Sequence, residues 1–190
     1  MAECKAIISQ IIEIYGRLVY THKTYEKCYE ICVKKASGLK LAQIILSGLT
    51  TFGVISTIVT NSTALGIISS IISAIDFIIT VYLKENDLND KATNYGIIAN
   101  SLVSIKEKWI SLLSDYVDLN LPLDKVSQRK EEIFKEQTEI LSSPIKTTSK
   151  GYKKAKTAIQ QNKECSFDDF KELKDLLPVH LRGLLDVPSN

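Results

Sequence analysis

The chain has 190 residues, of which 45% are hydrophobic and 24% are charged, and its formal net charge is +2. This length allows one domain, or a small domain attached to membrane segments. The positive excess does not indicate a nucleic-acid-binding protein, because it lies within residues 1–40, directly before a long uncharged block. Basic residues at that place are typical of a membrane protein.

Residues 5–37 are predicted to form one amphipathic helix. Apolar residues recur there at steps of three or four, with Lys and Glu between them. The segment has no signal-peptide core, so we expect residues 1–38 to be a cytoplasmic N-terminal helix. The apolar positions are Ile7, Ile11, Ile14, Leu18, Tyr25, Tyr29 and Cys32.

The uncharged block predicts two transmembrane helices. No Asp, Glu, Lys, Arg or His occurs from Leu41 to Ile75. One straight helix of that length would exceed the ~30 Å hydrocarbon core of a bilayer. The polar sequence at 60–63 suits a turn. Cutting there leaves 39–59 and 64–83, each close to the length needed to span, and so predicts a hairpin over residues 39–83.

The flanking lysines predict the topology of this hairpin. Basic residues lie on both sides of it and its tip is uncharged, so the positive-inside rule places both termini in the cytoplasm. Tyr82 suits the interfacial aromatic belt. A buried hairpin of a soluble bundle is the alternative, but little amphipathic helix remains to surround two apolar helices. The candidate lipid-headgroup contacts are Lys34, Lys35, Lys40 and Lys84.

The rest of the chain is expected to be cytoplasmic and helical, which makes the fold class all-α. Residues 84–141 carry a helical stripe from Tyr95 to Tyr116 and a further helix opened by Pro122. Residues 142–165 are predicted to be a linker or basic loop, where four lysines suit a solvated surface better than a phosphate or anionic-lipid site. Residues 166–190 are predicted to hold a short helix, with a cap at Ser166, and a tail.

Within the predicted hairpin, Asp76 is the candidate functional residue. An ionised carboxylate in the bilayer costs at least ~2.5 kcal/mol, so such residues usually serve a function. The alternative is that Asp76 lies close enough to the interface to be hydrated. Several hydroxyls also suit a polar conduit, although such groups often bond to their own helix backbone. The candidate pore-lining residues are Asp76, Ser69, Ser73, Thr50 and Thr57.

Small residues recur along the second apolar segment. Faces of this kind allow helices to approach closely in lipid, where water supplies no drive for association. They suit packing within the hairpin or, less strongly, contacts between copies. The candidate helix-packing residues are Gly53, Gly66, Ser70 and Ala74.

The sequence gives no indication of an enzyme, a metal site or a cofactor. It contains none of the common nucleotide-binding, hydrolase or zinc-protease motifs, and only His22 and His180 supply imidazoles. Cys28 and Cys32 are four residues apart without a His pair, so the cysteines, which also include Cys4 and Cys165, are expected to be reduced packing residues.

This order of segments resembles the SLATT family, the SMODS and SLOG-associating two-transmembrane effector domains of bacterial conflict systems. The resemblance covers essentially the whole chain and is carried by YTHKTYEKCYE (20–30), YGIIANSLVSIKEKWISLL (95–113) and SFDDFKELKDLLPVHLR (166–182). It implies an antiviral or abortive-infection effector that forms homo-oligomers and perforates the inner membrane.

The resemblance also implies a partner that supplies the trigger. That partner is a second-messenger synthase, a nucleotide-sensing SLOG-type sensor or a reverse transcriptase, because this chain carries no SLOG-like pattern of its own. A non-conducting membrane anchor that recruits a cytoplasmic partner is the alternative, followed by a soluble bundle. Direct nucleic acid binding is not expected.

Overall fold

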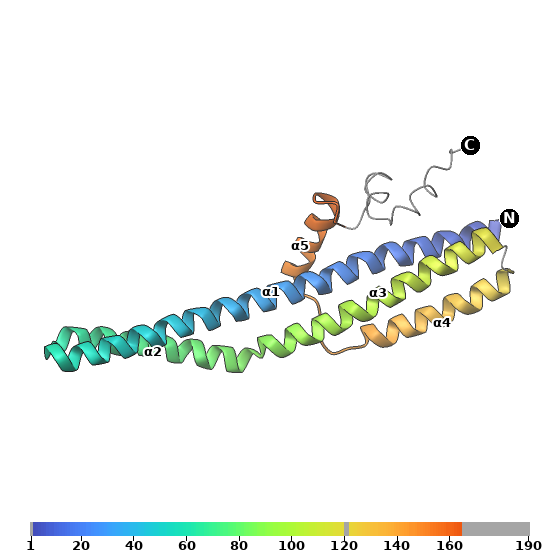
Figure 1. Ribbon diagram of the computed structural model, residues 1–190. Helices are drawn as coiled ribbons and strands as arrows, with labels where there is room; N and C mark the ends of the chain where they lie inside the picture. Colours follow the sequence, from blue (N-terminus) through green and yellow to red (C-terminus); the bar gives the residue numbers. More distant parts are fainter. Residues whose placement is uncertain (1, 120–121, 165–190) are drawn as a thin grey trace, which may run out of the picture.

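The computed structural model describes residues 2–119 and 122–164, with side chains described for 10–115 and 122–164. Five helices make up this part of the chain and it contains no strand, which confirms the all-α class. They form a long rod, with the N-terminus at one end and a hairpin corner at the other (Figure 1). The expected cap at Ser166, the short helix after it and His180 lie outside the described residues.

Helix α1 (Ala2–Thr60) contains both the N-terminal amphipathic segment and the first apolar segment. It continues through residue 38 without a break, because neither Pro nor a turn sequence interrupts it. At 1.5 Å per residue, its 59 residues span about 88 Å.

The hairpin corner lies where the sequence predicts it. Helix α1 ends at Thr60 and α2 (Thr63–Asn86) begins three residues later. Asn61 adopts a left-handed backbone conformation with φ 51°, which Asn tolerates better than most residues with a side chain. The expected pair of antiparallel apolar helices is therefore confirmed.

Helix α3 (Leu88–Leu119) runs antiparallel to the N-terminal half of α1, and the main core lies between them. Buried residues of α1 recur every seven positions at Ile11, Leu18 and Tyr25. A seven-residue repeat keeps one apolar stripe facing a partner helix. The predicted stripe of α3 is buried in the same way, except for Tyr116, whose side chain is not described; its buried members are Tyr95, Ile98, Leu102, Ile105, Trp109 and Leu112.

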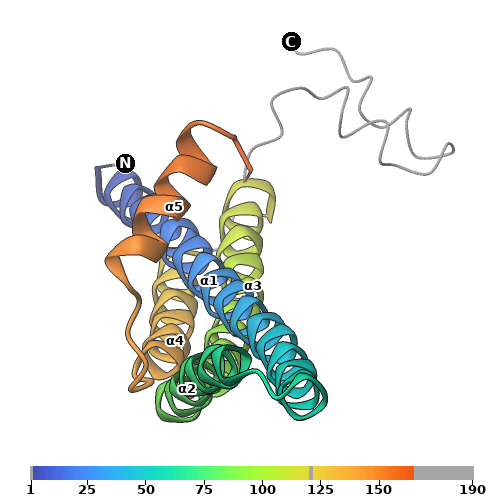
Figure 2. The ribbon, with the colours of Figure 1, turned by 90° about the vertical axis from the view of Figure 1, so that its left-hand side faces the viewer.

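Helix α4 (Leu123–Leu141) packs along α3 and begins directly after Pro122, as the sequence predicts. Val126 and Ile133 are buried in the same core. At the edges of this contact, Lys108 pairs with Glu136 at 2.6 Å. The end-on view in Figure 2 shows α1, α3 and α4 as a bundle, with α5 lying across α1.

Helix α5 (Ser149–Gln160) corrects the prediction of a linker or basic loop over residues 142–165. The Thr148 side chain caps the helix by accepting a hydrogen bond from the Gly151 N–H at 3.1 Å. Gly151, Ala155 and Ala158 form a narrow buried face. Its composition resembles that of a loop because four lysines lie on the exposed side of the helix. These are Lys150, Lys153, Lys154 and Lys156.

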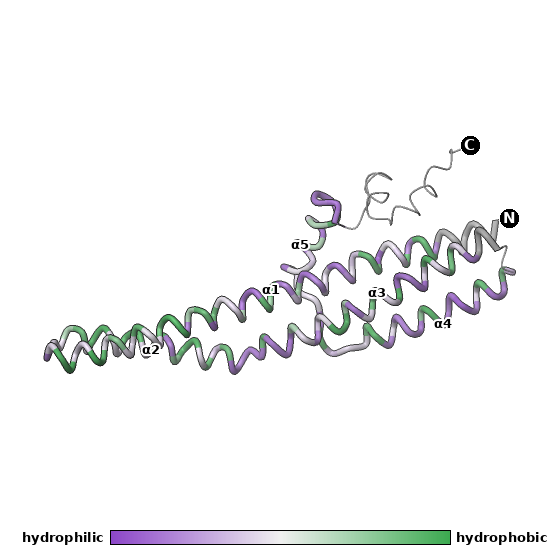
Figure 3. Tube along the Cα trace, viewed as in Figure 1, coloured by the Kyte–Doolittle hydropathy of each residue, from purple (hydrophilic) through white to green (hydrophobic). Residues whose placement is uncertain are grey.

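The hairpin exposes its apolar side chains instead of burying them. Phe52 and Val59 of α1 are 73% and 76% exposed, and Phe77 of α2 is 68% exposed. Figure 3 shows the apolar residues gathered toward the corner end of the rod. Both arms are long and apolar enough to cross a membrane. A soluble core would cover such side chains with protein, so this surface fits lipid.

Candidate functional site in the transmembrane hairpin

The two arms of the hairpin meet most closely through small residues. A Cβ atom added at Gly53 would collide with the Ser69 hydroxyl, and one added at Gly66 would lie 3.4 Å from Thr57 Cγ2. Ser69 is 4% exposed although the hairpin is mostly exposed. Close backbone approach of this kind is how helices pack in lipid. Gly53 and Gly66 thus lie inside the hairpin contact.

Three of the candidate pore-lining hydroxyls bond to their own helix. Ser69 donates to the Leu65 carbonyl at 2.9 Å, Thr50 donates to Leu46 at 3.0 Å and Thr57 donates to Gly53 at 2.8 Å. Such bonds satisfy a hydroxyl in a membrane helix without any partner helix. The same side chains nevertheless line a surface groove.

This groove runs along one face of the hairpin. Its part farther from the corner encloses about 460 Å³ and is lined by Thr50, Thr57, Gly66, Ser69, Ser70 and Ser73, with Val54 and Ile58. Toward the corner it continues past Ser70 and Ala74 to Asn61. Ser70, Ser73 and Ala74 are exposed in it. The candidate helix-packing residues therefore differ in position: Gly53 and Gly66 contact the other arm, and Gly66 also borders the groove, whereas Ser70 and Ala74 face outward.

Asp76 accepts a hydrogen bond across the hairpin. The Ser47 hydroxyl donates to Asp76 Oδ2 at 3.0 Å. The second oxygen, Oδ1, is buried and has no hydrogen-bond partner in the described part of the chain. Asp76 lies eight residues before Lys84, which corresponds to about 12 Å along the helix. A carboxylate at this depth with one free oxygen has spare capacity to accept a proton, a cation or another donor.

A second polar contact lies one turn farther from the corner. Gln43 Nε2 donates to the Thr80 hydroxyl at 2.7 Å. Sequence reasoning did not select Ser47, Gln43 or Thr80. The predicted corner at 60–63 could have indicated these partners. In two antiparallel arms that meet there, residues whose numbers sum to 123 lie at the same level, as 43 and 80 or 47 and 76 do.

The candidate headgroup lysines lie at the end of the hairpin opposite the corner. Lys34, Lys35, Lys40 and Lys84 are all exposed. Lys35 Nζ donates to the Tyr82 hydroxyl and lies 4.7 Å from the centre of its ring. A cation over an aromatic face is stabilised by the ring quadrupole. This pair joins the two arms at the level where lysine and tyrosine typically meet lipid headgroups.

The described residues contain no group of three or more His, Cys, Asp or Glu side chains placed to hold a metal ion. Cys28 is buried and Cys32 is half-buried, and both are free thiols. Cys28 Sγ accepts a hydrogen bond from the Thr148 N–H at 3.4 Å, so its role in this structure is packing.

Comparison with protein-family models identifies a family. The family model described as "SMODS and SLOG-associating 2TM effector domain family 4" matches residues 7–171, which is most of the chain. Neither the curated proteins nor the solved structures contain a match to this chain.

Proposed function

Because the chain belongs to family 4 of the SMODS and SLOG-associating two-transmembrane effector domains, we propose that it oligomerises and perforates the membrane when a partner triggers it. The setting is a bacterial antiviral or abortive-infection system. The chain acts without catalysis of its own, and the separately encoded partner is a second-messenger synthase, a SLOG-type sensor or a reverse transcriptase.

The outward groove of the hairpin is the observation that carries this proposal. Ser70 and Ser73 are exposed in a segment whose surface is mostly apolar. Polar groups facing lipid are unfavourable, and closely packed hairpins remove them from lipid. A ring of hairpins whose grooves face a common axis would give these hydroxyls water, with Asp76 nearby.

The topology belongs to the same proposal. Both termini lie in the cytoplasm, the corner at Asn61 faces the opposite side, and the membrane is the inner membrane. Lysines at the entry of both arms and an uncharged corner support this orientation through the positive-inside rule. In an otherwise cysteine-free chain, Asn61→Cys should react with an impermeant thiol reagent from outside. Protection in intact cells with labelling after lysis would reverse the assignment.

Release of dye from liposomes tests perforation. The reconstituted, triggered chain should release dye, and Ser70→Leu with Ser73→Leu should reduce release because leucines fill the groove. Thr51→Leu is the matched control, since Thr51 is exposed but does not line the groove. Intact liposomes at full reconstitution with the trigger present would refute the proposal.

The alternative is a non-conducting anchor that recruits a partner through its cytoplasmic helices. Ile12 and Phe134 are both more than half exposed, near a cavity of about 340 Å³ between Ile14 and Phe134. An anchor predicts that Asp76→Asn and the groove variants leave function intact, whereas Phe134→Ser abolishes it. A pore predicts that Asp76→Asn and the groove variants impair function more than Phe134→Ser does.

A further inference from the structure

Helix α5 rests on α1 through a contact that buries little apolar area. Its inner face consists of Gly151, Ala155 and Ala158, and the approach is close enough that a Cβ at Gly151 would collide with Cys28 Sγ. Hydrophobic stabilisation grows with buried apolar area, so one glycine and two methyl groups contribute little. The α1–α3 core, with Trp109 and Leu102 fully buried, is held much more strongly.

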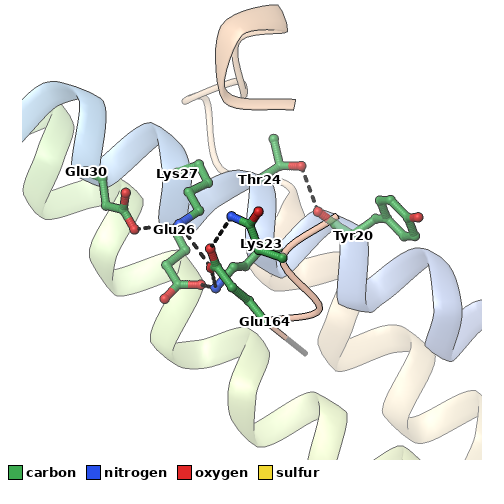
Figure 4. A network of polar contacts seen from close by, with 8 residues as sticks. Tyr20, Lys23, Thr24, Glu26, Lys27, Glu30 and Glu164 are labelled. Carbon is green, nitrogen blue, oxygen red and sulfur yellow. Dashed lines mark hydrogen bonds and ion pairs between the residues drawn. The ribbon is translucent and has the colours of Figure 1, made fainter. Parts of the chain in front are cut away.

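Polar contacts directly after α5 add to the stability with which it is attached to α1. Glu164 Oε2 lies 2.8 Å from Lys23 Nζ and 3.1 Å from Lys27 Nζ, so one carboxylate oxygen bridges two lysines of α1 (Figure 4). Asn162 Nδ2 donates to the other oxygen of Glu164 at 3.3 Å. The Lys23 side chain is 9% exposed. Charge-assisted bonds of this kind are about twice as strong as neutral ones.

The ionisation of this group follows from its partners. Hydrogen bonds from Lys23, Lys27 and Asn162 lower the pKa of the Glu164 carboxyl to about 2. Burial lowers the pKa of the Lys23 ammonium, but hydrogen bonds to Glu164 and Glu26 outweigh burial and the pKa is raised. Both groups are therefore charged over the physiological range.

The connection before α5 crosses between α1 and α3. The Tyr95 hydroxyl donates to the Lys146 carbonyl at 2.8 Å, and the Tyr25 hydroxyl donates to the Ile145 carbonyl at 3.4 Å. The two tyrosine rings contact each other with centres 6.0 Å apart. One tyrosine comes from each helix, so residues 145–146 tie α1 to α3 a few turns before the membrane entry at Lys35.

Detachment of α5 would leave no unpaired charge on α1. Lys23 keeps Glu26 at 2.8 Å and Lys27 keeps Glu30 at 3.0 Å, both within one turn of the same helix. An unpaired buried charge would make the detached state costly. Because each lysine has a partner in either state, detachment breaks mainly the Glu164 bridge, the two tyrosine bonds and the Cys28–Thr148 contact.

We propose that residues 142–164 are a releasable clamp, locked by the bridge from Glu164 to Lys23 and Lys27, that braces α1 against α3 a few turns before the membrane entry. In the attached state the clamp keeps the hairpin closed. In the detached state the two arms are free to rearrange. The structural half of this proposal is independent of pore formation, whereas its effect on the hairpin rests on the proposed function.

Limited proteolysis of the full chain in detergent tests the lock. Trypsin cuts after the lysines at 150, 153, 154 and 156, which the helical, attached α5 protects. Glu164→Gln should raise the cleavage rate there about tenfold, because losing one bond to a charged group is worth roughly a factor of ten in the open population. Glu107→Gln is the matched control, an exposed glutamate on α3 without an ion pair in the described region. Equal rates for Glu164→Gln and wild type would overturn the lock.

Charge reversal separates a specific bridge from general destabilisation. Lys27→Glu should also raise cleavage of α5. Adding Glu164→Lys should restore part of the protection, because the new ammonium would pair with the carboxylate introduced at position 27, whereas Lys23 would repel it. A double variant that is cleaved as fast as Lys27→Glu would show that the bridge does not hold α5.

Dye release from liposomes tests whether the clamp controls the hairpin. Glu164→Gln should release dye without a trigger, and the charge-reversed pair should release less. Fast cleavage of α5 with wild-type release would overturn the control of the hairpin by the clamp. Absence of dye release from every variant, with the trigger present, would count against the proposed function. The proteolysis experiment would then still decide whether the Glu164 bridge holds α5 on α1.

Discussion

Ser47 donates a hydrogen bond of 3.0 Å to Asp76 and so ties the two transmembrane arms together at the level of the only carboxylate within residues 39–83. Asp76 Oδ1 has no hydrogen-bond partner among the described residues. Within that part of the chain, the bond from Ser47 is therefore the side-chain hydrogen bond that the carboxylate accepts from the other arm. The pair therefore fixes the register of the arms as well as their separation.

Removing the Ser47 hydroxyl should weaken the hairpin. Hydrogen bonds between membrane helices contribute about 0.6 kcal/mol on average and up to about 1.7 kcal/mol, and a carboxylate acceptor favours the upper end. Ser47→Ala should lower the unfolding free energy in mixed micelles by that upper amount. Thr51→Ala should change it little, because the Thr51 hydroxyl bonds within its own helix. Equal effects would show that the cross-helix bond contributes nothing measurable.

Adding one methyl group at Gly53 should separate the arms. The new Cβ would collide with Ser69 Oγ, and Ser69 lies in the closest part of the hairpin contact. Overpacking typically costs about 1–3 kcal/mol. Gly48→Ala is the matched control, because a Cβ there meets no atom within 4 Å. Disulfide cross-linking between cysteines placed across the corner should slow for Gly53→Ala and not for Gly48→Ala.

Trp109 should be the most sensitive position of the core between α1, α3 and α4. Its side chain is fully buried and its indole N–H donates to Gln137 Oε1 at 3.0 Å. Trp109→Ala should destabilise the bundle by about 3–5 kcal/mol, and Trp109→Phe by less. Ile110→Ala, at an exposed neighbour, should stay within about 0.5 kcal/mol of wild type. Chemical denaturation followed by circular dichroism measures all three.

Acidification should weaken the bundle of α1, α3 and α4 through His22. Burial, followed by the charge of Lys106, lowers the pKa of His22 below its ordinary value of 6.5. The unfolded chain then binds a proton at a pH where the folded chain does not, so stability is complete above about pH 6.5 and falls as the pH drops toward the folded pKa. His22→Gln should flatten this dependence. An unchanged slope in urea titrations between pH 7 and 5 would assign it to other groups.

The long elements of the fold were predictable because each has a strong local signal. The corner at 60–63 combines polar turn residues with apolar segments on both sides, and the seven-residue repeat of α3 marks its buried face. Helix α5 was missed because its buried face contains only glycine and alanine. Its burial depends on the space beside Cys28, which no local pattern records.

The candidate site was predictable in its residues and not in their partners. Asp76 stands out because it is charged, whereas Ser47 and Gln43 are ordinary polar residues of a moderately apolar helix. Their importance comes from the register across the corner, which requires both arms to be placed in space. Division of the small residues into an inner pair and an outer groove also depends on how the arms are rotated.

The two arms of the hairpin differ mechanically. Helix α1 is unbroken from Ala2 to the corner, so a rotation applied near Lys23 is transmitted along one continuous helix toward Gly53. The other arm has a joint at Asp87, where a left-handed residue with φ 42° separates α2 from α3. A torque on the bundle outside the hairpin would therefore act unequally on the two arms and change the groove between them.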